Sequence, residues 1–224
     1  MSYLFQKPVT NAEITAKTHL SLTHEILDYL WYFAKVFVVV LVAYLLIKDT
    51  VYRNFEVEGE SMAPNYHSHD YVFVNKMAQK LGDIKRGDVV VFQEPDAVCP
   101  KMSAKGSCFL IKRIIGLPGE SVTLENGKVF ITNAVYPKSI QLDESKYLAP
   151  SMNSYSDGSS DIRKTNYGVI PANTFFAMGD NRTNSTDSRF SQVGEITLSQ
   201  IQGKEFYRQG SGFFSLPSYN ITND

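Results

Sequence analysis

A serine that could act as a nucleophile lies in the segment EGESMAP, at residues 58–64. The conformational freedom of Gly59 and the turn that ends at Pro64 allow the hydroxyl of Ser61 to be presented, with backbone N–H groups close to it. A serine in such a turn is more often only a turn residue. Ser61 therefore becomes a catalytic candidate only if the chain also supplies a base.

Two kinds of base are available. His67 and His69 follow the serine closely, so a Ser-His-Asp arrangement stays open. Alternation along an apolar run places Lys112 on one strand face with Leu110 and Ile114. Burial among such side chains lowers the pKa of a lysine from about 10.4, and a neutral amine can act as the general base for a serine hydroxyl. The alternative is a lysine at a strand edge whose ammonium group reaches solvent.

A third candidate segment is GDNRTNSTDSR, at residues 179–189, directly after an apolar strand. Its density of Asp, Arg and hydroxyl side chains is typical of a loop that is fixed by its own hydrogen bonds and carries function. A solvated turn has a similar composition, so both interpretations stay open on the residues alone.

The composition restricts the class of protein around these segments. The chain has 224 residues, which indicates one folded domain, or one domain with an appendage. With 43% of them hydrophobic and 20% charged, a disordered, collagen-like or polytopic membrane protein is excluded. Its 22 Lys and Arg balance 23 Asp and Glu, so no nucleic-acid partner is expected. Cys99 and Cys108 lack the further ligands of a zinc site, and neither a metal nor an organic cofactor is expected.

The appendage is an apolar run, LWYFAKVFVVVLVAYLLI, at residues 30–47. As a helix its 18 residues would be about 27 Å long, which suits a transmembrane anchor. A buried core element is one alternative, and a cleaved signal is another, although no small-x-small site follows the run. If Lys35 belongs to the N-terminal side, the positive charges weakly favour a cytoplasmic segment at 1–29 and an extracytoplasmic domain at 48–224.

The remainder of the chain predicts a mainly β domain. Short β-branched or aromatic runs indicate strands at 71–74, 88–92, 109–115, 121–124, 128–131 and 174–178. The Asn126-Gly127 pair predicts a tight hairpin between two of them. A short helix near 75–79 is the one further helix expected, and the polar run at 149–164 is expected to be a surface loop.

Taken together and in order, these segments resemble the bacterial type I signal peptidases, which are membrane-anchored serine peptidases that remove signal peptides. The resemblance covers most of residues 30–207 and includes the anchor, EGESMAP, KRGDVVVF (85–92), IKRIIGLPGE (111–120), VIPANTFFAMGDNRTNSTDSR (169–189) and GKEFYR (203–208). It implies an antiparallel β catalytic domain of the signal-peptidase and LexA-like type, preceded by one transmembrane helix and carrying a variable insert around 132–168.

The resemblance also implies roles for individual residues. Ser61 matches the nucleophile, Lys112 the general base, and Ser185 the hydroxyl that orients the lysine. The oxyanion hole would use the backbone N–H of Ser61 and a group at position 59. Some members carry a serine there, whereas this chain has Gly59, so the second donor is either a backbone N–H or absent.

Further matches concern the support of the site and its substrate pocket. Arg113 with Asp180, and Asp187 with Arg189, resemble two structural ion pairs. The positions that would line shallow apolar pockets for small side chains are Phe55, Val57, Val72, Val91 and Ile111. Any of these five could equally be a plain core residue.

The chain departs from the family pattern in places. Asn65 and Tyr66 stand where Thr-Leu is usual, and His69 stands where Gly is common. We interpret these changes as affecting the rim of the site, and thus substrate preference, rather than the dyad formed by Ser61 and Lys112. Cys99 and Cys108 would form a disulfide if the domain lies outside the membrane, the alternative being two free thiols.

The expected function is therefore that of signal peptidase I. This hydrolase would cleave after small-x-small (Ala-x-Ala) sites through an acyl-enzyme, with signal peptides and the lipid bilayer as partners, near the protein-export machinery. Its expected location is the bacterial plasma membrane, as a single-pass protein. Two alternatives remain: a Ser-Lys peptidase with another membrane-associated substrate, and a catalytically inactive, surface-anchored β module that binds a partner.

Overall fold

The structure is a computed structural model of residues 1–224, and it describes residues 11–94, 108–135, 137–148 and 164–210. The chain forms two compact units, residues 1–49 and residues 50–224.

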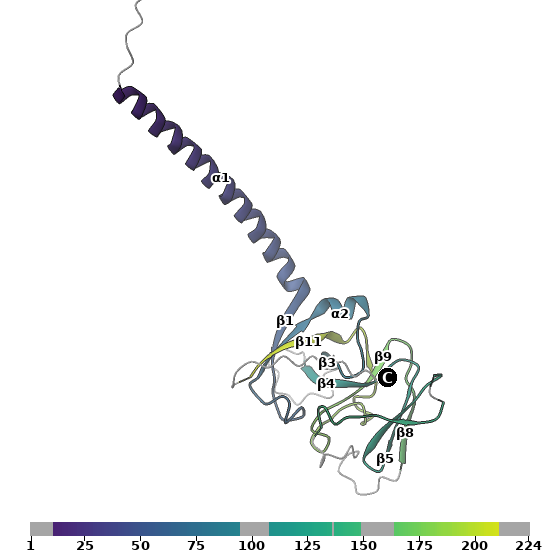
Figure 1. Ribbon diagram of the computed structural model, residues 1–224. Coiled ribbons are helices and arrows are strands. Elements are labelled where there is room, and N and C mark those ends of the chain that lie inside the picture. Colours follow the sequence, from purple (N-terminus) through teal and green to yellow (C-terminus); the bar gives the residue numbers. More distant parts are fainter. Residues whose placement is uncertain (1–10, 95–107, 136, 149–163, 211–224) are drawn as a thin grey trace, which may run out of the picture. The chain divides into compact units, whose positions relative to one another are not determined.

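The first unit is dominated by helix α1 (Asn11–Val51), which is drawn in purple and blue in Figure 1. Its 41 residues contain no glycine or proline, so nothing in the sequence interrupts the backbone hydrogen bonds. The stretch His24–Leu45 is long and apolar enough to cross a membrane. The helix thus includes the predicted anchor at 30–47 and extends beyond it at both ends.

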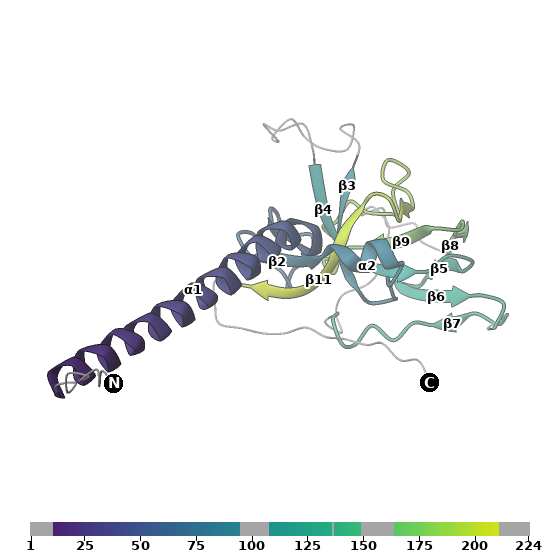
Figure 2. The same cartoon turned by 90° about the horizontal axis from the view of Figure 1, so that it is seen from above.

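The second unit is built from two antiparallel sheets (Figure 2). The larger has the strand order β1-β2-β11-β3-β4-β9-β10, with β1 (Tyr52–Glu56), β2 (Tyr71–Asn75), β3 (Val89–Glu94), β4 (Cys108–Gly116), β9 (Thr174–Met178), β10 (Ile196–Thr197) and β11 (Ile201–Gln209). The smaller has the order β7-β6-β5-β8, with β5 (Ser121–Glu125), β6 (Lys128–Thr132), β7 (Ile140–Gln141) and β8 (Lys164–Val169). The predicted mainly antiparallel β domain is confirmed.

Local sequence explains several of these elements. β5 and β6 pair around Asn126 and Gly127, whose φ angles of 50° and 75° form the predicted tight hairpin. The short helix α2 (Lys76–Leu81) begins at Asn75, whose side chain accepts a hydrogen bond from a backbone N–H of the first turn. It ends at Gly82 with a φ of 68°, a conformation that glycine adopts without steric cost.

The structure also contains strands that the sequence did not predict. β8 follows the region interpreted as a surface loop, and its sequence KTNYGV has little β-propensity of its own. It forms because it pairs with β5, so tertiary contacts decide the conformation. The predicted insert around 132–168 is therefore partly regular structure, with β7 and β8 both inside it or at its edge. Residues 136 and 149–163 lie outside the described residues.

Strand order brings remote segments together. β4 lies between β3 and β9 in the larger sheet, with Val90 opposite Lys112 and Met178 opposite Arg113. The turn that contains Ser61 connects β1 to β2, and the segment 179–189 follows β9 directly. The fold thus brings the Ser61 turn and the segment 179–189 to β4, the strand that carries Lys112.

Candidate active site

The central contact joins the serine to the lysine. The Nζ atom of Lys112 lies 2.7 Å from the Oγ atom of Ser61 and also donates to the backbone carbonyl of Ile111, at 2.9 Å. Lys112 is only 2% exposed, whereas Ser61 is partly accessible. A buried amine thus touches a hydroxyl that a substrate can reach.

The surroundings of Lys112 make its neutral form easier to reach than in solvent. Burial lowers the pKa of Lys112 to about 8, and the negative charges of Asp187 and Asp180 limit the shift. With a pKa of about 8, roughly a tenth of the lysines carry a free amine at pH 7. In this neutral form the amine can accept the proton of the Ser61 hydroxyl, which lies 2.7 Å away.

The candidate bases differ in their position relative to Ser61. The imidazole of His69 is mostly exposed and pairs with Glu56 at 2.9 Å, and His67 is exposed as well. Lys112, by contrast, is in hydrogen-bond contact with the hydroxyl. Among the described residues, the geometry therefore supports a Ser-Lys pair rather than a Ser-His-Asp arrangement.

The segment 179–189 is hydrogen-bonded to the turn that contains Ser61. The backbone N–H of Asn181 donates to the carbonyl of Ser61, and its side-chain amide donates to the carbonyl of Glu60, each at 3.0 Å. Gly179 is needed for this close approach, since a Cβ atom there would lie 2.4 Å from the Ser61 carbonyl oxygen and 2.2 Å from Oγ of Ser185.

This arrangement also orients the backbone N–H of the nucleophile. In a trans peptide the N–H of Ser61 points opposite to the carbonyl of Glu60, which Asn181 holds. The Ser61 N–H makes no hydrogen bond to any described residue. It is therefore available to bind an oxyanion.

The backbone N–H of Gly59, unlike that of Ser61, has a hydrogen-bond partner. Its φ of 89° lies in the region that favours glycine, and its backbone N–H donates to Oγ of Ser68 at 3.3 Å. The N–H of Gly59 is therefore already engaged, and the second oxyanion donor stays open.

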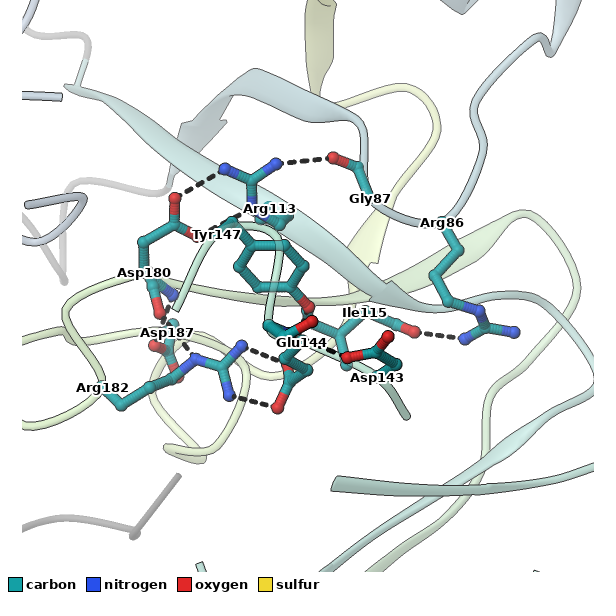
Figure 3. Close-up of polar contacts among 12 residues, drawn as sticks. Arg86, Gly87, Arg113, Ile115, Asp143, Glu144, Tyr147, Asp180, Arg182 and Asp187 are labelled. Atoms are coloured by element: carbon teal, nitrogen blue, oxygen red, sulfur yellow. Dashed lines mark hydrogen bonds and ion pairs between the residues drawn. The ribbon is translucent and has the colours of Figure 1, made fainter. Parts of the chain in front are cut away.

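Both predicted ion pairs are present. Arg113 donates two hydrogen bonds to Asp180, at 2.7 and 2.6 Å, and a third to the carbonyl of Gly87 (Figure 3). Arg189 donates two to Asp187, at 2.7 and 2.8 Å, and all four side chains are almost completely buried. Burial alone would raise the pKa of Asp187, but the hydrogen bonds and charge of Arg189 lower it, so this carboxylate stays charged.

Ser185 reaches the site without the predicted contact. Its side chain is 9% exposed and packs against Gly179, but no hydrogen bond joins it to Lys112 among the described residues. Its role in orienting the lysine stays a prediction.

The predicted pocket residues belong to one apolar cluster. Val57, Val72 and Val91 are buried in it together with Met62. Two partly buried members complete the predicted set, Phe55 and Ile111. The structure thus brings these residues together beside the nucleophile turn, while their contact with substrate stays a prediction.

Cys108, at the start of β4, is disulfide-bonded, whereas Cys99 lies outside the described residues, so the pairing stays a prediction. Among the described residues, no group of His, Cys, Asp and Glu side chains could hold a metal ion.

Sequence reasoning missed one set of residues at the site. Figure 3 shows Arg182 reaching Glu144, and Tyr147 lying beside Arg113. Glu144 and Tyr147 were placed in a variable insert, and the polar composition around them hid their contacts. A signal was present in the apolar pair Tyr147-Leu148, which the structure buries at 4% and 9% exposure.

Asn65 also differs from its interpretation. Instead of lying at the rim, its side-chain amide donates to Asp180 at 2.8 Å and to the carbonyl of Tyr147 at 2.7 Å. Asn65 therefore contacts Asp180 and Tyr147, which belong to the groups around Arg113, rather than the rim of the site.

A serine hydroxyl in contact with a buried lysine amine is the arrangement that a serine hydrolase of the Ser-Lys type requires. The family model "Signal peptidase, peptidase S26" matches residues 30–209, which include both members of the pair. The chain therefore belongs to the type I signal peptidases of this family.

Two relatives from Bacillus subtilis agree with this assignment. "Signal peptidase I S" of Bacillus subtilis (strain 168) is 35% identical over 76% of this chain and 83% of that protein. "Signal peptidase I T" of the same strain is 31% identical over 87% of this chain and 89% of that protein. A crystal structure of a signal peptidase I from Enterococcus faecalis V583 is 22% identical, with a TM-score of 0.37, and covers 54% of this chain and 95% of that one.

Proposed function

We propose that this signal peptidase cleaves exported pre-proteins after small-x-small sequences, with Ser61 as the nucleophile and Lys112 as the general base. The observation that carries the proposal is the 2.7 Å contact between Oγ of Ser61 and Nζ of the buried Lys112. A base must lie within hydrogen-bond reach of the proton it removes, and this amine does.

The reaction follows from this contact. Neutral Lys112 takes the proton of Ser61 as Oγ attacks the scissile carbonyl, and the resulting oxyanion binds the free N–H of Ser61. The ammonium of Lys112 then gives its proton to the leaving amine, so that the C–N bond breaks and an ester remains on Ser61. Lys112 next deprotonates a water molecule, which hydrolyses the ester and releases the new carboxyl end.

The apolar cluster supports the choice of substrate. Phe55, Val57, Val72, Val91 and Ile111 would form shallow walls next to Ser61, which suit alanine at the two small positions of the site. Signal peptides carry such small-x-small sequences at the end of their apolar segment.

The N-terminal helix supports a membrane location. We propose that it anchors the protein in the bacterial plasma membrane with a cytoplasmic N-terminus, so that residues 48–224 act outside the cytoplasm near the export machinery. The apolar segment of a pre-protein also lies in the bilayer, so anchoring raises its effective concentration at the active site.

The test uses the full chain in detergent with a pre-protein that carries an Ala-x-Ala site. Wild type should cleave after the second Ala, as read from the new N-terminus of the product. Ser61→Ala and Lys112→Met should lose cleavage while remaining folded, whereas Lys128→Met, at an exposed lysine, should retain it. Cleavage that survives both dyad substitutions would contradict the mechanism, and a folded but inactive wild type would favour the binding module.

A further inference from the structure

A seven-residue segment that the sequence assigned to a variable insert lies against the catalytic loop. This segment, residues 142–148, follows β7, and we call it the strap. Its backbone is tied to β6 by a hydrogen bond from the N–H of Leu142 to the carbonyl of Val129, at 2.8 Å. Leu142, Tyr147 and Leu148 are buried in the core beside the smaller sheet. The strap is thus part of the packed domain.

The first attachment of the strap is a buried ion pair. The Glu144 carboxylate pairs with both terminal nitrogens of Arg182, whose side chain is completely buried (Figure 3). The remaining Nε of Arg182 donates to the carbonyl of Gly179, at 2.9 Å. Glu144 is therefore the counter-charge of a guanidinium that holds Gly179, the residue that packs directly on the carbonyl of Ser61.

The second attachment is made by Tyr147. The guanidinium of Arg113 lies 4.3 Å from the centre of the Tyr147 ring, and the Tyr147 hydroxyl donates to Glu144 at 2.8 Å. Burial raises the pKa of Tyr147 well above its usual value, so the hydroxyl remains a donor. One tyrosine thus contacts both the ion pair of the strap and the arginine that follows Lys112 in the chain.

Asn65 completes the link from the strap to the nucleophile turn. The residue follows Ser61 by four positions, and its backbone N–H donates to Met62 in the same turn. Its amide group bonds both the carbonyl of Tyr147 and the carboxylate of Asp180. A threonine in this position has a single hydroxyl donor and could not make both bonds. This connection is therefore particular to the residue that this chain carries.

We infer that the strap is a positioning element, in which Glu144 and Tyr147, acting through Arg182 and Asn65, keep the Ser61 turn and the 179–189 loop in the geometry that the reaction needs. The inference rests on the proposed function. The strap acts on the supports of the nucleophile, so it affects the rate of the chemical step more than substrate binding. Small displacements of reacting groups are costly, which makes such supports catalytically important.

The test measures kcat and KM of the full chain in detergent with the Ala-x-Ala pre-protein. Asn65→Thr and Glu144→Gln should each lower kcat by about tenfold while KM stays within about twofold. Tyr147→Phe keeps the carbonyl and the ring, so it should lose no more than about threefold. Lys146→Gln, an exposed change in the same strap, should match wild type.

A double variant shows whether the two attachments act as one unit. Asn65→Thr combined with Glu144→Gln should lower kcat by clearly less than the product of the two single effects, because both disturb the same support. Titration of active Ser61 with a serine-acylating inhibitor gives the concentration of folded enzyme for each variant. These values allow kcat to be stated per active site.

Each outcome decides between the two proposals. Wild-type kcat per active site in Asn65→Thr and Glu144→Gln would overturn the strap inference, because a merely structural role changes the number of active sites and not their rate. A loss confined to KM would overturn it as well. Failure of both wild type and Lys146→Gln to cleave would instead overturn the proposed function.

Discussion

The two sides of the catalytic lysine are built on different principles. On one side, Arg113, Asp180, Asp187 and Arg189 are buried charged groups joined in two-bond ion pairs. On the other side lies an apolar cluster that includes Val57, Val72 and Val91. The stability of the polar side depends on directional hydrogen bonds between fixed partners, whereas the stability of the apolar side depends on how well its side chains fill the available volume. The difference implies that the polar side tolerates little change and the apolar side tolerates volume-conserving exchanges.

Breaking a buried pair on the polar side should have the largest effect. Asp187→Asn leaves the Arg189 guanidinium buried without its counter-charge, and such losses cost about 3–5 kcal/mol of unfolding free energy. Chemical denaturation of wild type and variant measures this cost. The exposed change Asp143→Asn should cost less than about 0.5 kcal/mol. An equally small cost for Asp187→Asn would contradict the view that the pair organises this side.

A change at the contact between Gly179 and the turn that contains Ser61 should have the next largest effect. Gly179→Ala places a methyl group 2.4 Å from the backbone carbonyl of Ser61, so the turn must move. A displacement of that order lowers kcat by about 100-fold. Gly194→Ala is the comparison, since a Cβ atom there has open space although its φ is positive. Steady-state kinetics on both variants measure the difference, and equal rates would rule out the steric argument.

Glu205 is a carboxyl group near the polar side, and among the described residues no guanidinium lies in hydrogen-bond contact with it. Burial raises the pKa of Glu205 to about 7, although Tyr66 and the charges of Arg113 and Arg208 oppose the shift. Because the folded-state pKa is raised, stability is lost as pH rises from about 4.5 to 7, and the loss is complete above that range.

Glu205→Gln removes this pH-dependent loss. The variant should gain on the order of 2 kcal/mol over wild type at pH 8, with the advantage declining toward pH 4. Denaturation at the two pH values measures the change. A variant that is less stable than wild type at pH 8 would show that the charged form of Glu205 is favourable in the fold.

A volume-conserving change on the apolar side should have the smallest effect. Met62→Leu alters a fully buried side chain of the cluster and should cost less than about 1.5 kcal/mol. Cleavage kinetics should remain close to wild type. A loss as large as that of Asp187→Asn would mean that the apolar side is as intolerant as the polar side.

The same contrast explains what the sequence could predict. Ser61 and Lys112 were predicted as catalytic residues because their segments carry residue types that suit chemistry, and the resemblance to the family predicted the two ion pairs. The strand that contains Lys112 was predicted from its β-branched and aromatic run, and the hairpin from Asn126-Gly127, since both signals are local.

The missed features depend on contacts between distant segments. β8 has weak intrinsic propensity and forms by pairing with β5. The strap has a polar sequence, and its importance lies in the partners Arg182, Arg113 and Asn65. No pattern within residues 142–148 shows which buried guanidinium their carboxylate meets, so only the folded structure reveals the connection.

The pH dependence of kcat/KM tests the central claim most directly, because it reports the ionisation of the free enzyme. The account predicts a rate that rises about tenfold per pH unit at low pH and levels off through a pKa of about 8, as Lys112 loses its proton. Asp187 raises the pKa of Lys112, so folded Asp187→Asn should shift this limb toward lower pH. A limb centred near 6.5, as for histidine, or one unmoved in Asp187→Asn would contradict the account.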